Sequence, residues 1–131
     1  SNGAFVRELS DCRTFCRRRD VEGMQAAGLA LGGGLDNAIV VDGAHVLNPE
    51  GFRRDDECVR HKMLDALGDL YLAGAPVIGR YEGRKAGHRT TNQLLRELFS
   101  RPDAWRMIEC TRAVADRLPG AHISAEDYLR A

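Results

Sequence analysis

The clearest pattern of hydrophobic and polar positions lies between residues 55 and 73. Hydrophobic residues recur there every three or four positions, which predicts an amphipathic helix. The acidic run Asp55-Asp56-Glu57 suits its first turn, because the N-terminal end of a helix dipole is positive. We expect the helix to run to about Ala73 and to stop at Gly74. Its apolar face is formed by Val59, Met63, Ala66, Leu67 and Leu70.

Shorter patterns predict three more helices. One covers residues 20–27 and is ended by Gly28. A capping box over residues 90–93 starts another near Thr90. Pro102 starts a third, short helix that contains Trp105. The helix that starts near Thr90 is expected to direct four residues inward: Leu94, Leu95, Leu98 and Phe99.

Strands are predicted where short apolar runs are bounded by turn residues. These runs are 5–9, 38–42 and 76–81, and the second is apolar enough for a buried strand. Asn48-Pro49-Glu50-Gly51 predicts a turn. Helices and strands that mix without strict alternation are typical of an α+β domain. We expect a two-layer sandwich of a small mixed sheet and packed helices.

Composition narrows the class of protein. The chain has 131 residues, the size of one domain, and 44% are hydrophobic, which is enough for a core. Nineteen basic residues balance nineteen acidic ones, which argues against a general nucleic-acid binder and a polybasic membrane anchor. The longest strongly apolar run, residues 38–41, is far shorter than the roughly 20 residues that span a bilayer. We therefore expect no nucleic-acid partner and no membrane span.

The N-terminus and the cysteines indicate a reducing compartment. Residues 1–3 are expected to be an expression scar, and no signal-peptide pattern follows them. The single domain is then expected to cover residues 4–131. The four cysteines, at positions 12, 16, 58 and 110, lack the spacing of a zinc finger and are expected to be reduced thiols of a cytosolic protein.

One face of the helix over residues 55–73 carries polar chemistry. At about 100° per residue, His61, Asp65 and Asp69 fall together, and Lys62 borders them. A His and an Asp four residues apart can bind one metal ion, although a catalytic zinc site needs three protein ligands. The same spacing also fits a solvated helix face with a His–Asp contact. The spacing alone leaves both interpretations open.

His88 is the second candidate for chemistry. It follows Gly87, whose lack of a side chain lets the backbone approach a ligand closely. An imidazole there suits proton transfer near neutral pH, and an exposed loop histidine fits the pattern as well. No role is assigned to His45 or His122.

Several motifs in one order carry a resemblance to a known family. Gly32-Gly33-Gly34-Leu35-Asp36-Asn37 precedes the predicted strand over 38–42, without the spacing of a nucleotide-binding loop. His61-Lys62-Met63-Leu64-Asp65-Ala66-Leu67-Gly68-Asp69 follows, and then Gly87-His88. This order closely resembles the zinc-dependent UDP-3-O-acyl-N-acetylglucosamine deacetylases of lipid A biosynthesis, from about Val6 to Phe99.

The resemblance implies half of a two-domain enzyme. Members of that family have two α+β domains with zinc and substrate between them, and this chain resembles only the second. His61 and Asp65 are then the zinc ligands that this half supplies. The third ligand, a histidine, and an adjacent glutamate base are expected from the missing N-terminal domain. The isolated chain should therefore be inactive. It is also expected to self-associate through the exposed seam, the face that carries His61, Asp65 and neighbouring apolar groups and that the first domain would otherwise cover.

The resemblance also implies roles for individual residues. His88 corresponds to the general acid, and Asp69 to the carboxylate that orients it and favours its charged form. Thr14 corresponds to a residue that stabilises the oxyanion. Four further residues correspond to positions that contact substrate: Phe15, Lys62, Lys85 and Gly87.

A βαβ insert over about residues 17–41 is implied as well. In the family its apolar lining forms a passage for the acyl chain of the substrate. The expected lining here is Val21, Met24, Ala30, Ala38 and Val40. Arg17, Arg18 and Gly34 depart from the family pattern, which leaves the length of the preferred acyl chain open.

The sequence therefore predicts the C-terminal domain of a cytoplasmic zinc amidohydrolase from a Gram-negative bacterium. Its substrate would be an acylated UDP-N-acetylglucosamine. An alternative is a non-enzymatic module of the same fold that binds a nucleotide sugar or a protein partner. A second alternative is a different metal hydrolase that shares the helix motif.

Overall fold

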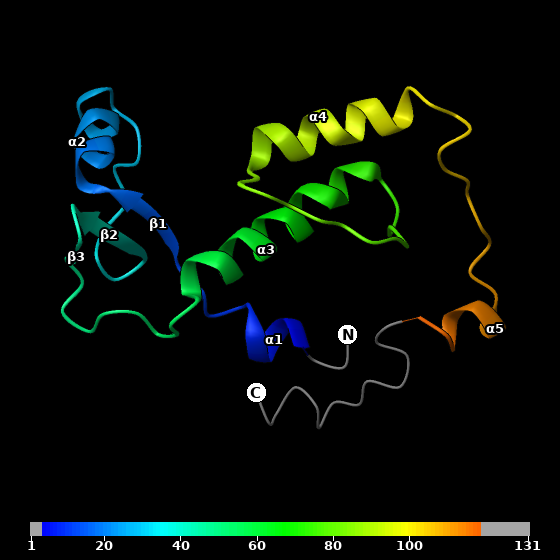
Figure 1. Ribbon diagram of the computed structural model, residues 1–131, viewed down its shortest axis with the longest axis horizontal. Coiled ribbons are helices and arrows are strands. Elements are labelled where there is room, and N and C mark those ends of the chain that lie inside the picture. Colours follow the sequence, from blue (N-terminus) through cyan, green and yellow to red (C-terminus); the bar gives the residue numbers. More distant parts are fainter. Residues whose placement is uncertain (1–3, 119–131) are drawn as a thin grey trace. The chain divides into compact units, whose positions relative to one another are not determined.

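The computed structural model describes residues 4–118, and their architecture is α+β, as predicted. Within that range the chain forms a three-stranded mixed sheet and helices of very different lengths (Figure 1). It divides into two compact units. One unit is Asp11–His61, and the other is formed by the described residues on either side of it. The predicted expression scar and His122 lie outside the described residues.

The unit Asp11–His61 is built on a βαβ arrangement. Strand β1 (Thr14–Arg17) pairs in parallel with β2 (Ala38–Asp42), and β3 (His45–Val46) pairs antiparallel with β2. Parallel strands need a crossover, which helix α2 (Arg18–Ala26) and the loop after it provide. The helix packs against both parallel strands. The predicted helix over 20–27 and strand over 38–42 are confirmed, whereas β1 and β3 were not predicted.

The buried part of this unit centres on β2. Ile39 is fully buried. Beside it, the buried side-chain amide of Asn48 makes hydrogen bonds to the backbone that the short strand β3 does not supply. Asn48 Nδ2 donates to the carbonyl oxygens of Leu35 (2.7 Å) and Ala38 (2.8 Å), and Asn48 Oδ1 accepts from the backbone N–H of Val40 (2.9 Å). The predicted turn is confirmed, because the N–H of Gly51 donates to the Asn48 carbonyl.

Helix α3 (Glu57–Leu70) begins two residues after the predicted start, and its predicted end is confirmed. A 3₁₀ turn, η1 (Tyr71–Ala73), continues it, and Gly74 ends it with φ +77°, a left-handed conformation that favours glycine. On its predicted apolar face Ala66 is buried, while three larger residues are roughly half exposed: Val59, Met63 and Leu67. Self-association through the face of α3 that carries His61 and Asp65 stays a prediction.

Helix α4 (His88–Phe99) begins two residues before the predicted start. Its N-cap is Gly87, and Thr90 Oγ1 accepts from the Gly87 N–H at 2.9 Å. Thr90 is thus the third helical residue, where a capping side chain reaches back, and not the cap itself.

The direction of the side chains on α4 was predicted in part. Leu95 is buried, but Leu94 is 47% and Phe99 41% exposed, so the inward prediction is wrong for those two. Phe99 instead packs edge-on against Trp105, with ring centroids 5.2 Å apart. The predicted helix from Pro102 is also wrong: a turn closed by the Ala104 N–H on the Arg101 carbonyl stands there. A short helix, α5 (Arg112–Ala115), follows later.

Two predicted strands are absent from the described residues. Residues 5–9 lie mostly in a short helix, α1 (Ala4–Glu8), because the N–H groups of Leu9 and Ser10 both bond back to the Phe5 carbonyl. A five-residue apolar run does not distinguish helix from strand. Residues 76–81 form no strand, and Val77 and Ile78 are at least half exposed.

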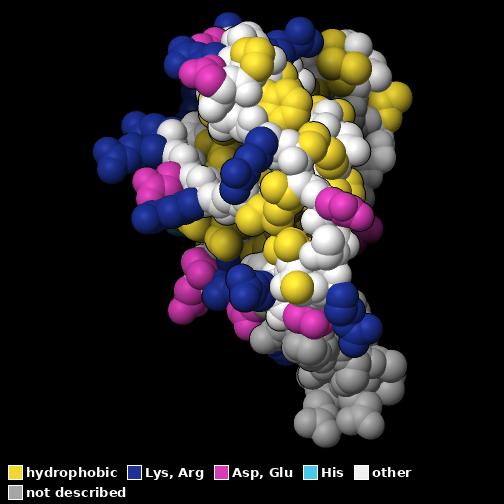
Figure 2. Space-filling model, turned by 90° about the vertical axis from the view of Figure 1, so that its right-hand side faces the viewer, with side chains coloured by type: hydrophobic (Ala, Val, Ile, Leu, Met, Phe, Trp, Pro, Cys, Tyr) yellow, Lys and Arg dark blue, Asp and Glu magenta, His cyan; other side chains and the backbone are white. Residues whose placement is uncertain are grey.

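Large apolar side chains are exposed across the unit that contains α4. Figure 2 shows one face of the molecule on which hydrophobic side chains gather, with charged side chains around them. Tyr71, Leu72 and Met107 are each more than 65% exposed. Among the helices of residues 4–118, none combines the length and the hydropathy that a membrane crossing requires.

Candidate functional site

His61 is held at its Nδ1 atom. It lies on α3, and Nδ1 is 2.9 Å from the backbone carbonyl oxygen of Cys12. A carbonyl oxygen only accepts, so Nδ1 carries the proton and donates. The ring of Phe15 meets the imidazole edge-on, with centroids 6.4 Å apart and planes at 83°. Both contacts lie within the unit Asp11–His61, and together they fix the orientation of the ring.

A buried ion pair lies one turn before His61. Glu57 is fully buried, and Arg13 is 5% exposed. Glu57 Oε1 accepts from Nε and from the backbone N–H of Arg13, both at 2.9 Å, while Oε2 accepts from the backbone N–H of Arg53 at 2.7 Å. The Arg13 guanidinium also donates to the Gly51 carbonyl at 2.8 Å and pairs with Glu50.

The charges of this pair are strongly stabilised. Burial raises the pKa of Glu57, but the hydrogen bonds from Arg13 and Arg53 outweigh it and lower the pKa to about 2. The hydrogen bond with Glu57 raises the pKa of Arg13. Sequence reasoning missed both residues, because Glu57 has the pattern of an ordinary acidic first turn. An arginine directly before Thr14 gave no signal of burial.

The second imidazole, His88, is held by a carboxylate in the other unit. His88 Nδ1 is 2.8 Å from Oδ1 of Asp69, and His88 Nε2 is 3.8 Å from Oδ1 of Asp65. The His88 side chain is 70% exposed, while that of Asp69 is 15% exposed. Asp69 Oδ2 is buried without a hydrogen-bond partner in the described structure. The predicted pairing of His88 with Asp69 is therefore present.

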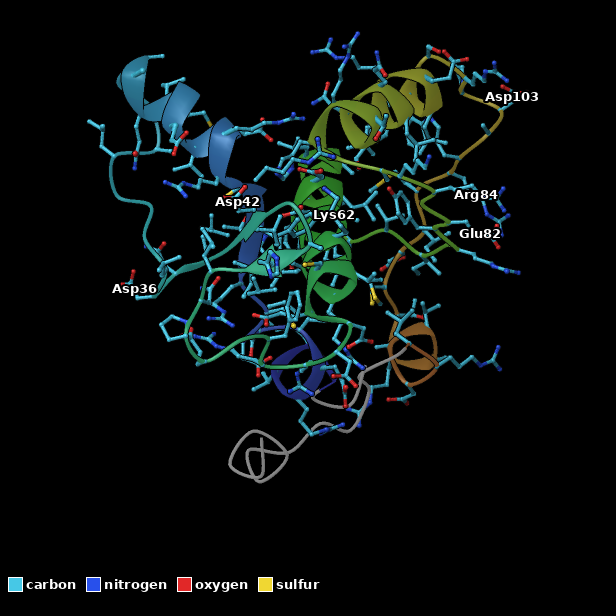
Figure 3. The ribbon with its side chains drawn as sticks, turned by 60° about the vertical axis from the view of Figure 1, so that its left-hand side comes forward. Asp36, Asp42, Lys62, Glu82, Arg84 and Asp103 are labelled. Carbon is cyan, nitrogen blue, oxygen red and sulfur yellow. The ribbon has the colours of Figure 1, made fainter. Side chains whose placement is uncertain are left out.

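Lys62 and Gly87 lie beside this pair. Lys62, on α3 (Figure 3), donates from Nζ to Oδ2 of Asp65 at 3.3 Å. A Cβ atom added at Gly87 would lie 3.6 Å from Lys62 Nζ, so the ammonium group reaches the backbone just before His88. Lys85 has φ +53°, an unusual conformation for a residue with a side chain, in the segment that leads to α4.

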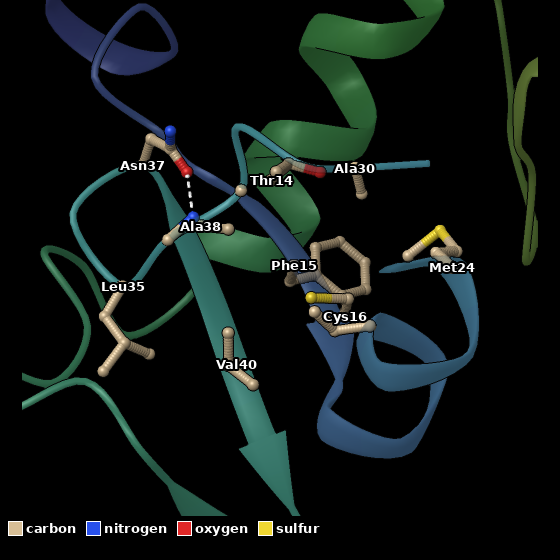
Figure 4. Close-up of a pocket in the computed structure, with 12 residues that line it drawn as sticks. Thr14, Phe15, Cys16, Met24, Ala30, Leu35, Asn37, Ala38 and Val40 are labelled. Carbon is tan, nitrogen blue, oxygen red and sulfur yellow. Dashed lines mark hydrogen bonds between the residues drawn. The ribbon is translucent and has the colours of Figure 1, made fainter. Parts of the chain in front are cut away.

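A pocket of about 390 Å³ lies in the unit Asp11–His61 (Figure 4). All five residues predicted to line an acyl passage border it: Val21, Met24, Ala30, Ala38 and Val40. Thr14 and Phe15 border it as well, together with Leu35, which sequence reasoning did not select. Asn37 shapes the loop at its rim, because its side chain bonds to Gly32 and Gly34. The pocket is apolar and of a size that suits a ligand.

The described part of the chain holds no group of three or more metal-binding side chains. His61 and Asp65 lie one turn apart along α3. The donor chemistry of these two residues fits zinc, which binds a neutral imidazole nitrogen and a carboxylate oxygen. The proton on His61 Nδ1 leaves Nε2 as the nitrogen with a lone pair. Two ligands leave a tetrahedral site incomplete.

Comparison with known proteins defines the family. A profile described as UDP-3-O-acyl N-acetylglycosamine deacetylase matches residues 1–100. Relatives named UDP-3-O-acyl-N-acetylglucosamine deacetylase are 60% identical over 104 residues in Phenylobacterium zucineum and 53% identical over 108 residues in Hahella chejuensis. These matches cover 79% and 82% of this chain. The match in Shewanella oneidensis is 45% identical over 129 residues, or 95% of this chain.

These matches place the chain in a family of deacetylases. It belongs to the UDP-3-O-acyl-N-acetylglucosamine deacetylase family, as the motifs in the sequence predicted. The chain spans only 36% of the length of the Phenylobacterium and Hahella relatives and 42% of the Shewanella relative.

Proposed function

We propose that the full-length protein removes the N-acetyl group from UDP-3-O-acyl-N-acetylglucosamine, and that this chain supplies part of its active site. The observation that carries the proposal is the His88–Asp69 pair, 2.8 Å apart at the start of α4, in a chain of this family. The reaction consumes one water: the amide C–N bond breaks, a C–O bond forms, and acetate and a free amine are released.

His88 is the general acid of this proposal. Asp69 accepts from its Nδ1, which orients the ring through a hydrogen bond to a charged acceptor. The protonated ring first donates a hydrogen bond to the developing oxyanion and then transfers its Nε2 proton to the leaving amine. The high exposure of His88 suits a group that must reach substrate. Thr14 adds a second donor for the oxyanion.

His61 and Asp65 are the zinc ligands of this proposal. A bound zinc ion would supply Lewis-acid activation of the amide and of the attacking water. The third ligand and the general base come from the N-terminal domain that this chain lacks, so the chain alone is inactive. The enzyme acts in the cytoplasm, where its nucleotide-sugar substrate is available.

The remaining residues bind substrate. The apolar pocket receives the 3-O-acyl chain, and Phe15 lies at its border. Lys62 and Lys85 pair with the diphosphate and sugar of the nucleotide, which explains two lysines in a chain whose other basic residues are arginines. Gly87 allows the substrate to approach the backbone before α4.

The decisive experiment is a deacetylation assay on the full-length gene product. Acetate release from UDP-3-O-acyl-N-acetylglucosamine should be rapid, should stop when a chelator removes the metal, and should return with added zinc. A full-length protein that binds the nucleotide sugar without releasing acetate would support a binding module instead. Turnover of unrelated amides in place of this substrate would support a different metal hydrolase.

The acyl pocket has a matched pair of variants on one helix. Val21→Phe narrows the pocket, whereas Gln25→Phe adds the same ring to α2 at an exposed position outside the lining. Val21→Phe should raise KM for the long-chain substrate, by about tenfold if contacts worth roughly 1.4 kcal/mol are lost, and leave a short-chain analogue unaffected. Gln25→Phe should behave like wild type. Equal effects of both variants would place the acyl chain elsewhere.

A further inference from the structure

Helix α3 makes hydrogen bonds to both the carbonyl and the N–H of one peptide group in the unit Asp11–His61. The carbonyl of Cys12 and the N–H of Arg13 belong to a single planar peptide unit. His61 Nδ1 donates to that carbonyl at 2.9 Å, and Oε1 of Glu57 accepts from that N–H at 2.9 Å. Glu57 and His61 lie four residues apart on α3, so they share one face of the helix.

Planarity couples these two hydrogen bonds. When Glu57 fixes the direction of the Arg13 N–H, it also fixes the direction of the Cys12 carbonyl, because the peptide plane does not rotate internally. The carbonyl then determines which ring nitrogen of His61 carries the proton. A glutamate that touches neither metal nor substrate is thus linked to the nitrogen that would bind metal.

The Glu57 carboxylate is itself held rigidly. Its two oxygens accept from the backbone of Arg13 and Arg53 and from the Arg13 guanidinium, and the whole side chain is buried. Arg13 balances its charge, which a buried carboxylate needs. The carboxylate therefore has one orientation available, and this orientation aims the peptide at His61.

We propose that Glu57 is a positioning residue for His61, acting through the Cys12–Arg13 peptide to keep the proton on Nδ1 and the lone pair on Nε2. This rests on the proposed function in one respect, the role of His61 as a zinc ligand. Carbonyl or carboxylate partners of metal-binding histidines set the tautomer and raise ligand basicity, and their loss costs about 10–100-fold in metal affinity.

The first test needs no variant. Long-range ¹H–¹⁵N spectra of the zinc-free, full-length protein distinguish a ring nitrogen with a proton from one with a lone pair. At roughly pH 8, where an ordinary imidazole is neutral, His61 should show a single tautomer with the proton on Nδ1. A proton on Nε2, or a mixture of tautomers, would overturn the proposal whether or not the protein is a deacetylase.

The second test compares three variants of the full-length protein. Glu57→Gln keeps the shape of the side chain but leaves one acceptor oxygen where the carboxylate has two. The two tautomers of His61 should therefore mix. Zinc affinity, measured by chelator competition, should fall about 10–100-fold. Arg13→Lys keeps the backbone N–H that Glu57 holds, and should keep the tautomer while losing stability. Asn48→Ala destabilises the same unit without touching Cys12 or His61, and should keep both tautomer and zinc affinity.

The outcomes separate this proposal from the proposed function. A folded Glu57→Gln protein with one tautomer and wild-type zinc affinity would overturn the positioning role. So would an Asn48→Ala protein whose zinc affinity falls as far as that of Glu57→Gln, since the effect would then be general destabilisation. A wild-type protein that shows the Nδ1–H tautomer but neither binds zinc nor deacetylates would instead refute the proposed function.

Discussion

His61 and His88 each donate a hydrogen bond from Nδ1 to an oxygen, but the two oxygens differ in charge. His61 meets the neutral carbonyl of Cys12, and His88 meets the carboxylate of Asp69. A neutral carbonyl acceptor orients the ring and holds the proton on Nδ1, which leaves Nε2 as the nitrogen with a lone pair. A carboxylate makes a shorter and stronger, charge-assisted hydrogen bond.

The surroundings of the two histidines differ as well. His61 is half-buried beside the ring of Phe15, and the Arg13–Glu57 pair holds the peptide that it contacts. His88 begins a helix and is 70% exposed. A ligand must keep one geometry, whereas an acid must meet a substrate that comes and goes. In the proposed mechanism the same type of side chain therefore serves two roles, and its hydrogen-bond acceptor and its burial distinguish them.

The largest expected effect separates the two histidines by metal content. In the full-length protein, His61→Ala should lose zinc and with it all measurable deacetylation, because one of few ligands is gone. His88→Ala should keep zinc. Metal analysis after gel filtration measures both. Equal zinc contents in the two variants would show that His61 is no ligand.

The next effect concerns catalysis without loss of metal. His88→Ala should lower kcat by about 10²–10⁴, the range for removing a general acid. Steady-state kinetics at saturating zinc measures it. Arg89→Ala, the neighbouring substitution on an exposed position of α4, should leave kcat nearly unchanged. Near-full activity of His88→Ala would remove His88 from the mechanism.

A third effect concerns Glu57, which holds the peptide that His61 contacts, and is measured as the pH dependence of folding stability. Because the folded state lowers the pKa of Glu57 to about 2, Glu57 is more acidic folded than unfolded. Its contribution to stability is present above the ordinary glutamate pKa of about 4.3 and is lost as the pH falls through about 2. Urea unfolding of the chain between these values should show stability falling steadily.

Two variants provide the controls for that pH dependence. Glu57→Gln should flatten the fall, since the group that titrates is gone. Arg18→Gln breaks exposed pairs with Glu22 and Asp42 and should leave the curve nearly unchanged, because exposed pairs contribute only about 0.2–1 kcal/mol each. An unaltered acid dependence in Glu57→Gln would assign it to another carboxylate.

The smallest effect is expected when the charged acceptor of His88 is replaced by a neutral one. Asp69→Asn keeps an oxygen for His88 Nδ1 but removes the negative charge, which makes the acceptor of His88 resemble that of His61. Deacetylation near neutral pH should then slow by roughly tenfold, or about 1.4 kcal/mol, because a neutral amide oxygen makes a weaker hydrogen bond than a carboxylate. An unchanged rate would show that only the orientation of the His88 ring matters.

Sequence reasoning succeeded where a pattern was long or a motif was specific. The helix over 55–73 was predicted with its end at Gly74, because periodicity and a glycine stop act locally. The five predicted pocket residues all border one pocket. The same reasoning failed for residues 5–9 and 76–81, where short apolar runs fit more than one conformation.

The buried Arg13–Glu57 pair shows a second limit of prediction from sequence. Arg13 and Glu57 are 44 positions apart, and each is a common residue in a common place. A local pattern predicted the turn that ends at Gly51. It does not encode the placement of Gly51 and Arg53 against this pair, on which the burial depends. The pairing of His88 with Asp69 was reached through the resemblance, since spacing alone left His88 open.

The 44-residue separation of Arg13 and Glu57 also has a consequence for how the protein is made. Closing a long loop costs entropy that only the surrounding contacts offset. Before closure, the Cys12 carbonyl is not yet aimed at His61, and the imidazole exchanges between tautomers. The nitrogen that would bind metal is thus prepared only when this unit has folded. In a chain still in synthesis both tautomers of His61 would be present, so a zinc ion bound as proposed would be held only after this unit has folded.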